Sequence, residues 1–367
     1  MRILIVEPFY AGSHKSWADE LKKFSKHTIE ILSLPGVHWK WRMHGAAVTL
    51  SRQTNELDFK PDLILCTDIM DIAVYKALLK ASLFAVPVLT YFHENQFNYP
   101  LSSNDTDRIK DRDNHYGFIN YTSCLASDHI LFNSHYNMNS FITSIEKLLP
   151  RFPDFNETVN IELIKRKSGV LPLGIDLSKL KKDREVSKEN RATLLWNHRW
   201  EHDKNPEAFF AALSELKDRG IEFKLIMLGK DYSGSPVLFE EVKEIFKDEI
   251  LHYGFAESRE LYMELLYKSD ILPVTSMHDF FGVSVVEAMY CNVIPLLPKR
   301  LAYPEHIPTE FHPAFFYEDD EEFVNKLQRM IMNVKVLRNQ KTRKFIEHYD
   351  WSVQINQYDK TFETLIV

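Results

Sequence analysis

Two carboxylates, Asp279 and Glu287, stand eight positions apart in the otherwise apolar stretch HDFFGVSVVEAMYCNVIP. A buried carboxylate is costly unless it is paired or hydrogen-bonded. The stretch VSVVEAMY has a helical pattern, so we expect Asp279 in the loop before a helix and Glu287 within its first two turns. A carboxylate that accepts two vicinal hydroxyls, as from a ribose, is well satisfied, which gives Glu287 a chemical role. The backbone N–H groups around Phe281, Gly282 and Val283 are candidate contacts for a phosphate or a sugar.

Two cations follow an earlier apolar run, ATLLW (192–196), in the stretch WNHRWEHDKNP. Arg199 can bind phosphate oxygens in a forked geometry, and Lys204 adds a compact positive charge. Both residues are therefore candidates to hold a diphosphate and to stabilise its charge during a reaction. The alternative is a surface salt-bridge cluster with Glu201 and Asp203, and the residues alone leave the two interpretations open.

The first apolar run of the chain is followed by EPFYAGSHK (7–15). Gly12 allows a tight turn, and the N-terminus of the next helix would offer free N–H groups to a diphosphate. Gly12 and Ser13 are therefore candidate contacts for the diphosphate of a ligand. The loop lacks the G-x-G-x-x-G fingerprint, which weakens a nicotinamide or flavin interpretation. An ordinary turn with Ser13 as helix N-cap is an equally good interpretation of this loop.

A third polar loop, YFHENQFNYP (91–100), follows the apolar run PVLTYF. His93 is a candidate to orient or deprotonate a hydroxyl of a substrate, and Glu94 and Asn95 beside it are candidate contacts for the same substrate. The alternative is that His93 and Glu94 cap or brace the loop. No second histidine stands at zinc-ligand spacing, so a metal site is not expected here.

The segment HWKWRMH (38–44) interleaves aromatic and basic residues. Trp39 or Trp41 could stack on an unpaired nucleobase, with Arg42 beside them. The alternative, that both tryptophans belong to the core, is about as probable for either one. Other basic side chains that could touch phosphate are Arg108, Lys110, Arg112 and Lys165–Lys167, although runs of charge are more often solvated faces.

The bulk composition is that of an ordinary globular protein: 367 residues, 45% apolar and 26% charged, with a net charge of −7. This charge gives no hint of a polyanionic partner, so any surface that binds RNA must be local. Cys66, Cys124 and Cys291 lie far apart, which argues against a zinc site or a disulfide framework and favours free thiols. No membrane span and no signal peptide are recognised, and we expect a cytoplasmic protein.

Short apolar runs alternate with longer amphipathic stretches, which predicts parallel βαβ units and an α/β fold. Two such series are present, separated by a charged stretch. The expected strands are 2–6, 29–33, 62–66, 87–92 and 129–132, then 192–196, 223–229, 250–254, 271–275 and 293–297. The expected helices are 14–25, 71–83 and 134–148, then 206–219, 237–247, 258–268, 283–291 and 319–332. Each candidate loop above directly follows an expected strand, the usual place for ligands of such sheets.

This division predicts an N-terminal Rossmann-like domain over 1–172, a linker over 173–192 and a C-terminal Rossmann-like domain over 193–349. The final amphipathic helix, about 350–367, is expected to pack back on the first domain. The linker and this helix are the expected hinge elements.

The pair Arg199 and Lys204, followed by the acidic pair Asp279 and Glu287, resembles the GT4-type retaining glycosyltransferases of GT-B fold. Further motifs resemble the tRNA-queuosine mannosyltransferases over nearly the whole chain. These motifs are FYAGSHK, HWKWR, YFHENQFNYP, FNSHYNMNSF, HRWEHDKNPEAFF and HDFFGV. This chain has Asp279 where the wider family usually has glutamate. The resemblance implies two Rossmann-like doubly wound domains facing across a cleft, the first for the acceptor and the second for a nucleotide-sugar donor.

The resemblance also implies a reaction: transfer of mannose from GDP-mannose to the cyclopentenediol of queuosine at the wobble position of tRNA-Asp. It implies that Arg199 and Lys204 hold the diphosphate, that Asp279 contacts the sugar, and that His93 positions sugar or acceptor. Ser134 lies in a matching motif and is carried over as an acceptor contact. No metal, other cofactor or obligate protein partner is implied. The alternatives are another nucleotide sugar, a lipid or polysaccharide acceptor, or a non-catalytic protein that binds RNA or a sugar nucleotide.

Overall fold

The computed structural model describes residues 1–100, 114–181, 186–229 and 238–366. The chain forms two compact units: Met1–Asp176 with Tyr349–Val367, and Leu177–His348. The first unit therefore includes the end of the chain. Arg108, Lys110 and Arg112 lie outside the described residues.

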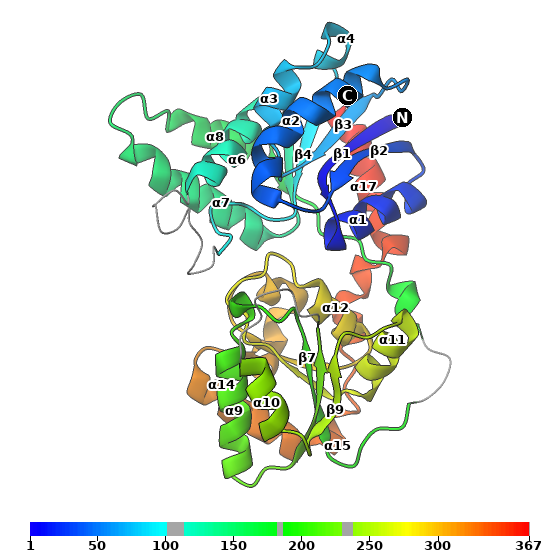
Figure 1. The fold of residues 1–367 in the computed structure, drawn as a ribbon, viewed down its shortest axis with the longest axis vertical. Coiled ribbons are helices and arrows are strands. Elements are labelled where there is room, and N and C mark those ends of the chain that lie inside the picture. Colours follow the sequence, from blue (N-terminus) through cyan, green and yellow to red (C-terminus); the bar gives the residue numbers. More distant parts are fainter. Residues whose placement is uncertain (101–113, 182–185, 230–237, 367) are drawn as a thin grey trace. The chain divides into compact units, whose positions relative to one another are not determined.

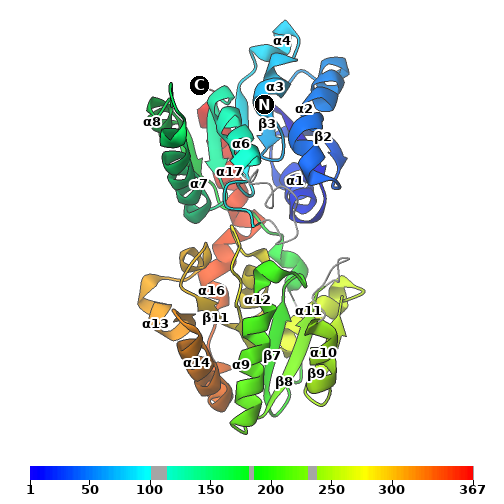
Figure 2. The ribbon, with the colours of Figure 1, turned by 60° about the vertical axis from the view of Figure 1, so that its left-hand side comes forward.

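The first unit is built on a parallel six-stranded sheet with the order β2-β1-β3-β4-β5-β6. Its strands are β1 (Arg2–Tyr10), β2 (Thr28–Pro35), β3 (Leu63–Thr67), β4 (Val88–Phe92), β5 (His129–Phe132) and β6 (Ser168–Val170). Helices lie on both faces of this sheet (Figures 1 and 2), which is why its strands appear as continuous apolar runs in the sequence. The short half-buried strand β6 has no such run and was not predicted.

The helices of the first unit are α1 (Gly12–Phe24), α2 (Trp39–Glu56), α3 (Ile72–Ala77), α4 (Ala81–Phe84), α6 (Asn114–Ala126), α7 (His135–Leu148), α8 (Val159–Arg166) and α17 (Trp351–Leu365). Helix α17 packs against α1 through paired aromatic and polar contacts. The indole N–H of Trp17 donates to the Tyr358 hydroxyl at 3.1 Å, and that of Trp351 donates to Glu20 at 2.8 Å. These buried contacts attach the end of the chain to the first sheet.

The second unit has its own parallel six-stranded sheet with the order β12-β11-β10-β7-β8-β9. Its strands are β7 (Ala192–Asn197), β8 (Phe223–Leu228), β9 (Ile250–Gly254), β10 (Ile271–Pro273), β11 (Ile294–Pro298) and β12 (Phe316–Tyr317). Its helices are α9 (Pro206–Asp218), α10 (Leu238–Ile245), α11 (Arg259–Lys268), α12 (Val283–Tyr290), α13 (His312–Phe315), α14 (Asp320–Met332), α15 (Val334–Leu337) and α16 (Arg343–Ile346). Both sheets confirm the predicted doubly wound α/β fold. The two-residue strand β12 was not predicted.

Gly282 fixes the start of α12. Its φ of 92° is in the left-handed region that favours glycine, and a Cβ at this position would lie 3.0 Å from the Tyr303 ring. The loop and helix that carry Asp279 and Glu287 therefore depend on a glycine between them.

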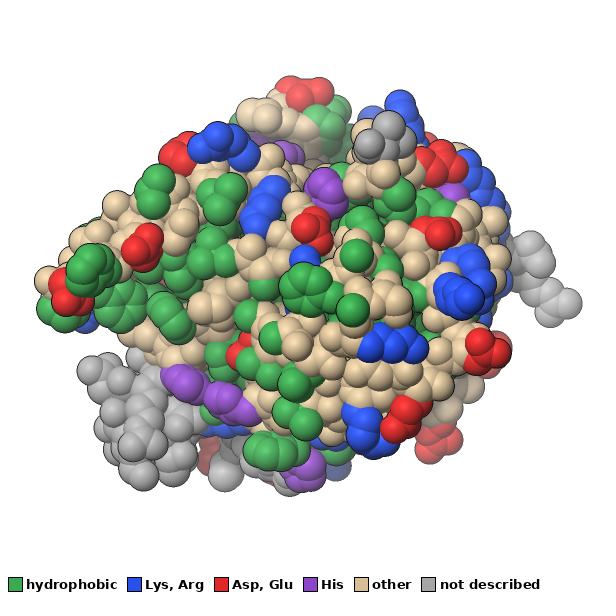
Figure 3. Space-filling view, turned by 90° about the horizontal axis from the view of Figure 1, so that it is seen from above, with side chains coloured by type: hydrophobic (Ala, Val, Ile, Leu, Met, Phe, Trp, Pro, Cys, Tyr) green, Lys and Arg blue, Asp and Glu red, His purple; other side chains and the backbone are tan. Residues whose placement is uncertain are grey.

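The surface carries charges of both signs. Figure 3 shows Lys and Arg side chains interspersed with Asp and Glu across one face. Cys66, Cys124 and Cys291 are free and buried, as expected. Within the described part of the chain, no helix combines the length and apolar character needed to cross a bilayer.

Candidate active site

Lys204 and Asp279 meet at the carboxyl end of the second sheet. Lys204 lies in a short 3-10 turn after β7, and Asp279 lies in the loop between β10 and α12. The Lys204 ammonium is buried, donates to the backbone oxygen of His278 at 2.7 Å, and pairs with Asp203 at 3.0 Å and Asp279 at 3.8 Å. An ammonium has three donors, and two are used at hydrogen-bond distance, so the third is available to a ligand beside Asp279.

Asp279 is held in its charged form. Burial alone would raise its pKa, but the Lys204 ammonium, the neighbouring His198 and His278 and the Phe281 amide together outweigh burial, and the pKa lies below its usual value. The Phe281 amide and the Tyr303 hydroxyl donate to its two oxygens at 3.3 and 3.2 Å. Burial and Lys204 lower the pKa of the neighbouring His198 to about 4, so this imidazole is neutral at pH 7. The site thus places a cation beside an anion. The cation can bind a phosphate group of a ligand, and the anion can accept a hydrogen bond from a ligand hydroxyl.

Glu287 is oriented by two residues of α11. Arg259 donates to one carboxylate oxygen at 2.7 Å and the Tyr262 hydroxyl donates to the other at 2.6 Å. Asn197, at the end of β7, donates in turn to the Tyr262 hydroxyl at 2.9 Å and to the Ser284 backbone oxygen at 3.2 Å. Each carboxylate oxygen has a second acceptor site, so a fixed Glu287 can still accept two hydroxyls.

Arg199 lies at the exposed edge of this region, where its guanidinium pairs with Glu201 at 3.3 Å. The alternative of a salt-bridge cluster therefore accounts for the contact of Arg199 with Glu201 and for that of Lys204 with Asp203. Phe281 already uses its amide on Asp279. The amides of Gly282 and Val283, at the start of α12, donate no hydrogen bond within the described residues.

In the first unit, Gly12 begins helix α1 with a φ of 51°. The N-cap is Ala11, without a side-chain cap, so the alternative role of Ser13 as N-cap was wrong. Within the described residues, the amides of Gly12 and Ser13 donate to no acceptor. They stay available to an anion.

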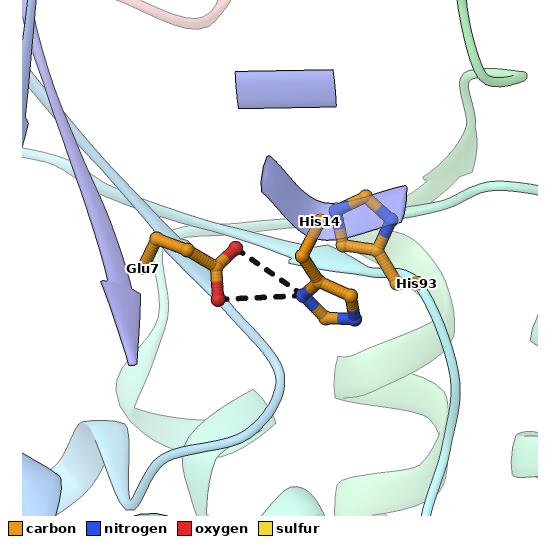
Figure 4. A group of neighbouring side chains, drawn as sticks. All are labelled: Glu7, His14 and His93. Carbon is orange, nitrogen blue, oxygen red and sulfur yellow. Dashed lines mark hydrogen bonds and ion pairs between the residues drawn. The ribbon is translucent and has the colours of Figure 1, made fainter. Parts of the chain in front are cut away.

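A buried cluster that the sequence did not reveal lies beside them: Glu7, His14 and His93 (Figure 4). Glu7 lies in β1, His14 in the first turn of α1, and His93 directly after β4. The Nδ1–H of His14 donates to both Glu7 oxygens, at 3.2 and 3.3 Å, and its ring stacks on His93 with a centroid distance of 4.1 Å. Glu7 and His14 were quoted in a candidate loop but given no role, because their contact arises only when β1 and α1 fold back together.

The two histidines carry different charges. Burial alone would lower the pKa of His14, but the Glu7 carboxylate raises it to about 9, so this imidazole is protonated at pH 7. Burial and the charge of His14 hold the pKa of His93 well below its usual value. The His93 Nε2 is buried and has no hydrogen-bond partner among the described residues. It is therefore placed to bind a ligand group rather than to remove a proton.

Glu94, Asn95 and Ser134 make contacts within the protein. Glu94 accepts from Gln96 at 2.8 Å. Asn95 is fully buried and bonds to Asn137 at 2.9 Å. Ser134 is the N-cap of α7 and accepts from the Asn137 amide at 3.0 Å. The contact of Glu94 matches the alternative that this residue braces the loop, and we assign no ligand contact to these three residues.

Trp39 and Trp41 both lie in the first turn of α2 but differ in exposure. Trp39 is half-buried against Tyr116, whereas Trp41 is 64% exposed, so the core interpretation fails for Trp41. A Cβ at Gly45 would lie 2.6 Å from the Trp41 ring, which shows that the indole rests directly on this glycine. Arg42 donates to the backbone oxygen of Pro35 at 3.2 and 3.3 Å and so anchors the helix.

The other basic candidates have partners within the protein. Lys165 pairs with Glu146 at 2.9 Å and Glu162 at 3.0 Å. Lys167 donates to the backbone oxygens of Leu125 and Ser127. We assign neither residue to a ligand.

Comparisons with solved structures extend these observations. A sucrose-phosphate synthase from Thermosynechococcus elongatus aligns with a TM-score of 0.70 over all of this chain and 99% of its own, at 11% identity. A glycosyltransferase from Rickettsia africae aligns with a TM-score of 0.68 over all of this chain and 98% of its own, at 16% identity. At these identities the likeness establishes the fold alone, which is GT-B.

Sequence comparisons match each unit to a family model. Residues 2–175 match the N-terminal domain of tRNA-queuosine alpha-mannosyltransferase, and residues 178–347 match the glycosyl transferases group 1. A tRNA-queuosine alpha-mannosyltransferase from Drosophila melanogaster is 34% identical over 95% of this chain and 92% of its own length. The chain is thus a glycosyltransferase, and it belongs to the tRNA-queuosine alpha-mannosyltransferase family.

Proposed function

We propose that this enzyme transfers mannose from GDP-mannose to the cyclopentenediol of queuosine at the wobble position of tRNA-Asp, with retention of configuration. The observation that carries the proposal is the 34% identity to the Drosophila melanogaster tRNA-queuosine alpha-mannosyltransferase over nearly the full length of both chains. Family membership supports the mannose and queuosine parts, and the charged groups of the second unit support a nucleoside diphosphate donor. We expect it to act in the cytoplasm.

The donor half of the proposal rests on Lys204, Asp279 and Glu287. The two ribose hydroxyls would donate to Glu287, which Arg259 and Tyr262 already orient. A sugar hydroxyl would donate to Asp279. The remaining Lys204 donor, with the exposed Arg199 and the amides that begin α12, would bind the diphosphate.

In the proposed reaction, the bond between the sugar C1 and the β-phosphate oxygen breaks and its electron pair goes to the phosphate. The acceptor hydroxyl attacks C1 from the same face, and its proton passes to the departing phosphate. Lys204 stabilises the charge that develops there, because a preorganised cation in a site shielded from water is worth several kcal/mol, of order 3. These cations supply the charge stabilisation without a divalent metal, so we expect chelators to leave the rate unchanged.

The acceptor half rests on the first turn of α2. Trp41 exposes most of its ring from a support on Gly45, and the Lys40 ammonium lies 5.7 Å from the centroid of the Trp39 ring. An exposed indole near a cation suits an unstacked nucleobase. This surface is local, in keeping with the mixed charges elsewhere.

We expect Trp41→Ala to raise the KM for tRNA by roughly tenfold and to leave the KM for the donor unchanged, since one base stack is worth about 1–3 kcal/mol. Steady-state kinetics with each substrate varied in turn would measure both constants. Phe84→Ala is the matched control, because Phe84 is also an exposed aromatic (52%) but lies in α4, before β4. Equal KM values for tRNA in the Trp41 variant and the wild type would contradict this role.

The proposal is tested by incubating the enzyme with tRNA-Asp and a panel of labelled donors: GDP-mannose, GDP-fucose, UDP-glucose and UDP-galactose. We expect label in RNA with GDP-mannose only. Transfer from a uridine donor would overturn the donor assignment, and efficient labelling of tRNA that lacks queuosine would overturn the acceptor assignment.

A further inference from the structure

His44, the last residue of the segment HWKWRMH, has no part in the chemistry described so far. It is an exposed residue of α2, and its Nε2 lies 3.2 Å from the Nε2 of His115, an exposed residue at the start of α6. The two rings stack with a centroid distance of 4.9 Å and an interplanar angle of 29°. Two helices that are distant in the sequence thus bring two imidazole nitrogens together at the surface of the first unit.

The buried ring of Tyr116 gathers further basic and aromatic groups around this pair. Its centroid lies 5.8 Å from that of the His44 ring and 5.4 Å from that of the His115 ring. The Trp39 ring lies 5.1 Å from the same centroid, and the Lys40 ammonium lies 5.9 Å from it. Basic groups interleaved with aromatic rings are the usual composition of a surface that binds single-stranded nucleic acid. The pair therefore belongs to the same surface as the tryptophans of α2.

The contact between the two imidazoles limits the number of protons that they hold. A hydrogen bond between two Nε2 atoms needs a proton on one of them and a lone pair on the other. Two fully protonated rings would turn N–H groups and positive charges toward one another, which is unfavourable unless an anion lies beside both.

The groups around His44 have the expected effect on its charge. Titratable groups face it from three elements: His115 and Tyr116 of α6, Asp71 before α3, and Lys40 one turn earlier on α2. Burial and then the charge of His115 lower the pKa of His44, and Asp71 opposes them. The pair can therefore take up a further proton when an anion binds to it.

An oxyanion fits this pair better than a metal ion. A zinc site in a protein usually has three or four protein ligands. Among the residues that the structure describes, the one group of three His, Cys, Asp or Glu ligand atoms close enough to share an ion belongs to Glu7, His14 and His93. His44 and His115 are not part of such a group. A phosphate oxygen, in contrast, can accept charge-assisted hydrogen bonds from two Nε2–H groups without a third ligand.

We propose that His44 and His115 together bind a backbone phosphate of the acceptor RNA, which accepts a hydrogen bond from the Nε2–H of each ring. The inference rests on the proposed function and extends the acceptor surface by one turn of α2. Side chains three positions apart on a helix are neighbours, at about 5–6 Å between Cβ atoms. A base stacked on Trp41 and the phosphate next to it can therefore reach the indole and His44 at the same time. As the RNA binds, the pair takes up one proton from water, so that both imidazoles donate.

The affinity for RNA should therefore increase as the pH falls. A bound phosphate stabilises the protonated pair, so the pKa of the pair is higher in the complex than in the free enzyme. Binding becomes tighter as the pH falls through the higher value, and the effect levels off below the lower value. Because one proton is taken up, the dissociation constant of tRNA-Asp should fall roughly tenfold between pH 8 and pH 6. Fluorescence anisotropy of labelled tRNA at constant ionic strength measures this change.

His44→Gln and His115→Gln each keep a polar side chain but prevent the uptake of the shared proton. Either substitution should remove most of the pH dependence of tRNA binding. At pH 6 it should also reduce the slope of log K against log salt concentration by roughly 0.7, the share of one phosphate contact to a single strand. His348→Gln is the matched control, because His348 is also exposed and has a pKa lowered by burial, but belongs to the second unit. It should keep the wild-type pH dependence.

Further comparisons identify the source of the phosphate. His115→Lys supplies a permanent charge and should bind tRNA at pH 8 nearly as tightly as the wild type does at pH 6. The glutamine variants should weaken the binding of tRNA with queuosine and of tRNA with guanosine at the wobble position by the same factor, because a phosphate contact carries no sequence information. They should leave the dissociation constant of GDP unchanged, since the phosphate belongs to RNA and not to the donor. Circular dichroism establishes that each variant is folded.

The results distinguish this inference from the proposed function. Wild-type affinity for tRNA that does not change with pH, or glutamine variants that keep the wild-type pH dependence, would overturn the role of the pair and leave the proposed function standing. Loss of tRNA binding in EDTA and its recovery with Zn²⁺ would also overturn that role, because the pair would then hold a metal ion. An enzyme that binds tRNA with the expected pH dependence but transfers no mannose would overturn the proposed function alone.

Discussion

Replacing Lys204 by methionine is expected to lower kcat by about 10²–10³-fold, the usual loss when one preorganised donor to a developing anion is removed. Lys204 is the buried cation nearest to Asp279, and its third donor is the one we assign to the leaving phosphate. Lys204→Arg keeps the charge in a wider side chain and should retain more activity. Initial rates at saturating donor and tRNA measure the effect. A kcat for Lys204→Met close to that of the wild type would remove Lys204 from the mechanism.

The same substitution should also destabilise the second unit, because Asp203 and Asp279 would lose their shared cation. Removing one partner of a buried ion pair costs about 3–5 kcal/mol. The double variant Lys204→Met/Asp203→Asn should regain part of this stability without regaining activity. Urea unfolding followed by circular dichroism gives the free energies, and recovery of both properties together would contradict the assignment.

The pH dependence of the free energy of unfolding in acid should change sign when Lys204 is replaced by methionine. In the wild type, burial would raise the pKa values of Asp203 and Asp279, but Lys204, with smaller contributions from neighbouring groups, brings them below the ordinary 3.8. Their ionised forms therefore favour the folded state above pH 3.8, and this contribution is lost as the pH falls. Without Lys204, burial would raise both pKa values, and stability would fall as the pH rises.

Glu287→Gln is expected to raise the dissociation constant of GDP by roughly 10–100-fold, because a carboxylate that accepts two ribose hydroxyls makes charge-assisted hydrogen bonds worth about 1.5–3 kcal/mol each. The glutamine keeps the size of the side chain, and Tyr262 can still donate to its oxygen. Isothermal titration calorimetry with GDP measures the change without the need for turnover.

A ligand without the two hydroxyls provides the control. The wild type and Glu287→Gln should bind 2′,3′-dideoxy-GDP equally weakly. This analogue lacks the ribose hydroxyls, so neither protein can form the hydrogen bonds assigned to Glu287. If Glu287→Gln weakened GDP and its dideoxy analogue by the same factor, Glu287 would not contact the ribose. Tyr262→Phe should produce a smaller loss with GDP, because it only loosens the carboxylate.

The doubly wound fold could be predicted from the sequence because buried parallel strands appear there as continuous apolar runs. Strands β6 and β12 were not predicted. Strand β6 consists of three half-buried residues and β12 of only two residues, and segments this short show no continuous apolar run. The contact between Lys204 and Asp279 could be anticipated because each follows a strand, and the strands β7 and β10 are neighbours in the sheet.

The rest of the site depends on contacts that the spacing of residues along the sequence does not predict. Arg259 and Tyr262 reach Glu287 from α11, a helix whose own pattern shows only amphipathicity. Glu7 and His14 resemble any charged pair near a turn until folding buries both. Trp39 and Trp41 are two residues apart, yet one faces a cluster of aromatic side chains and the other faces solvent, because they lie on different sides of α2.

The most direct measurement is mass spectrometry of the anticodon nucleoside. Queuosine-containing tRNA-Asp and the same tRNA with guanosine at the wobble position are incubated with the enzyme and GDP-mannose, then digested to nucleosides. We predict that queuosine gains the mass of one hexose residue with the wild type and not with Lys204→Met, and that guanosine gains nothing. An unchanged queuosine nucleoside, or a hexose attached to another nucleoside, would contradict the account.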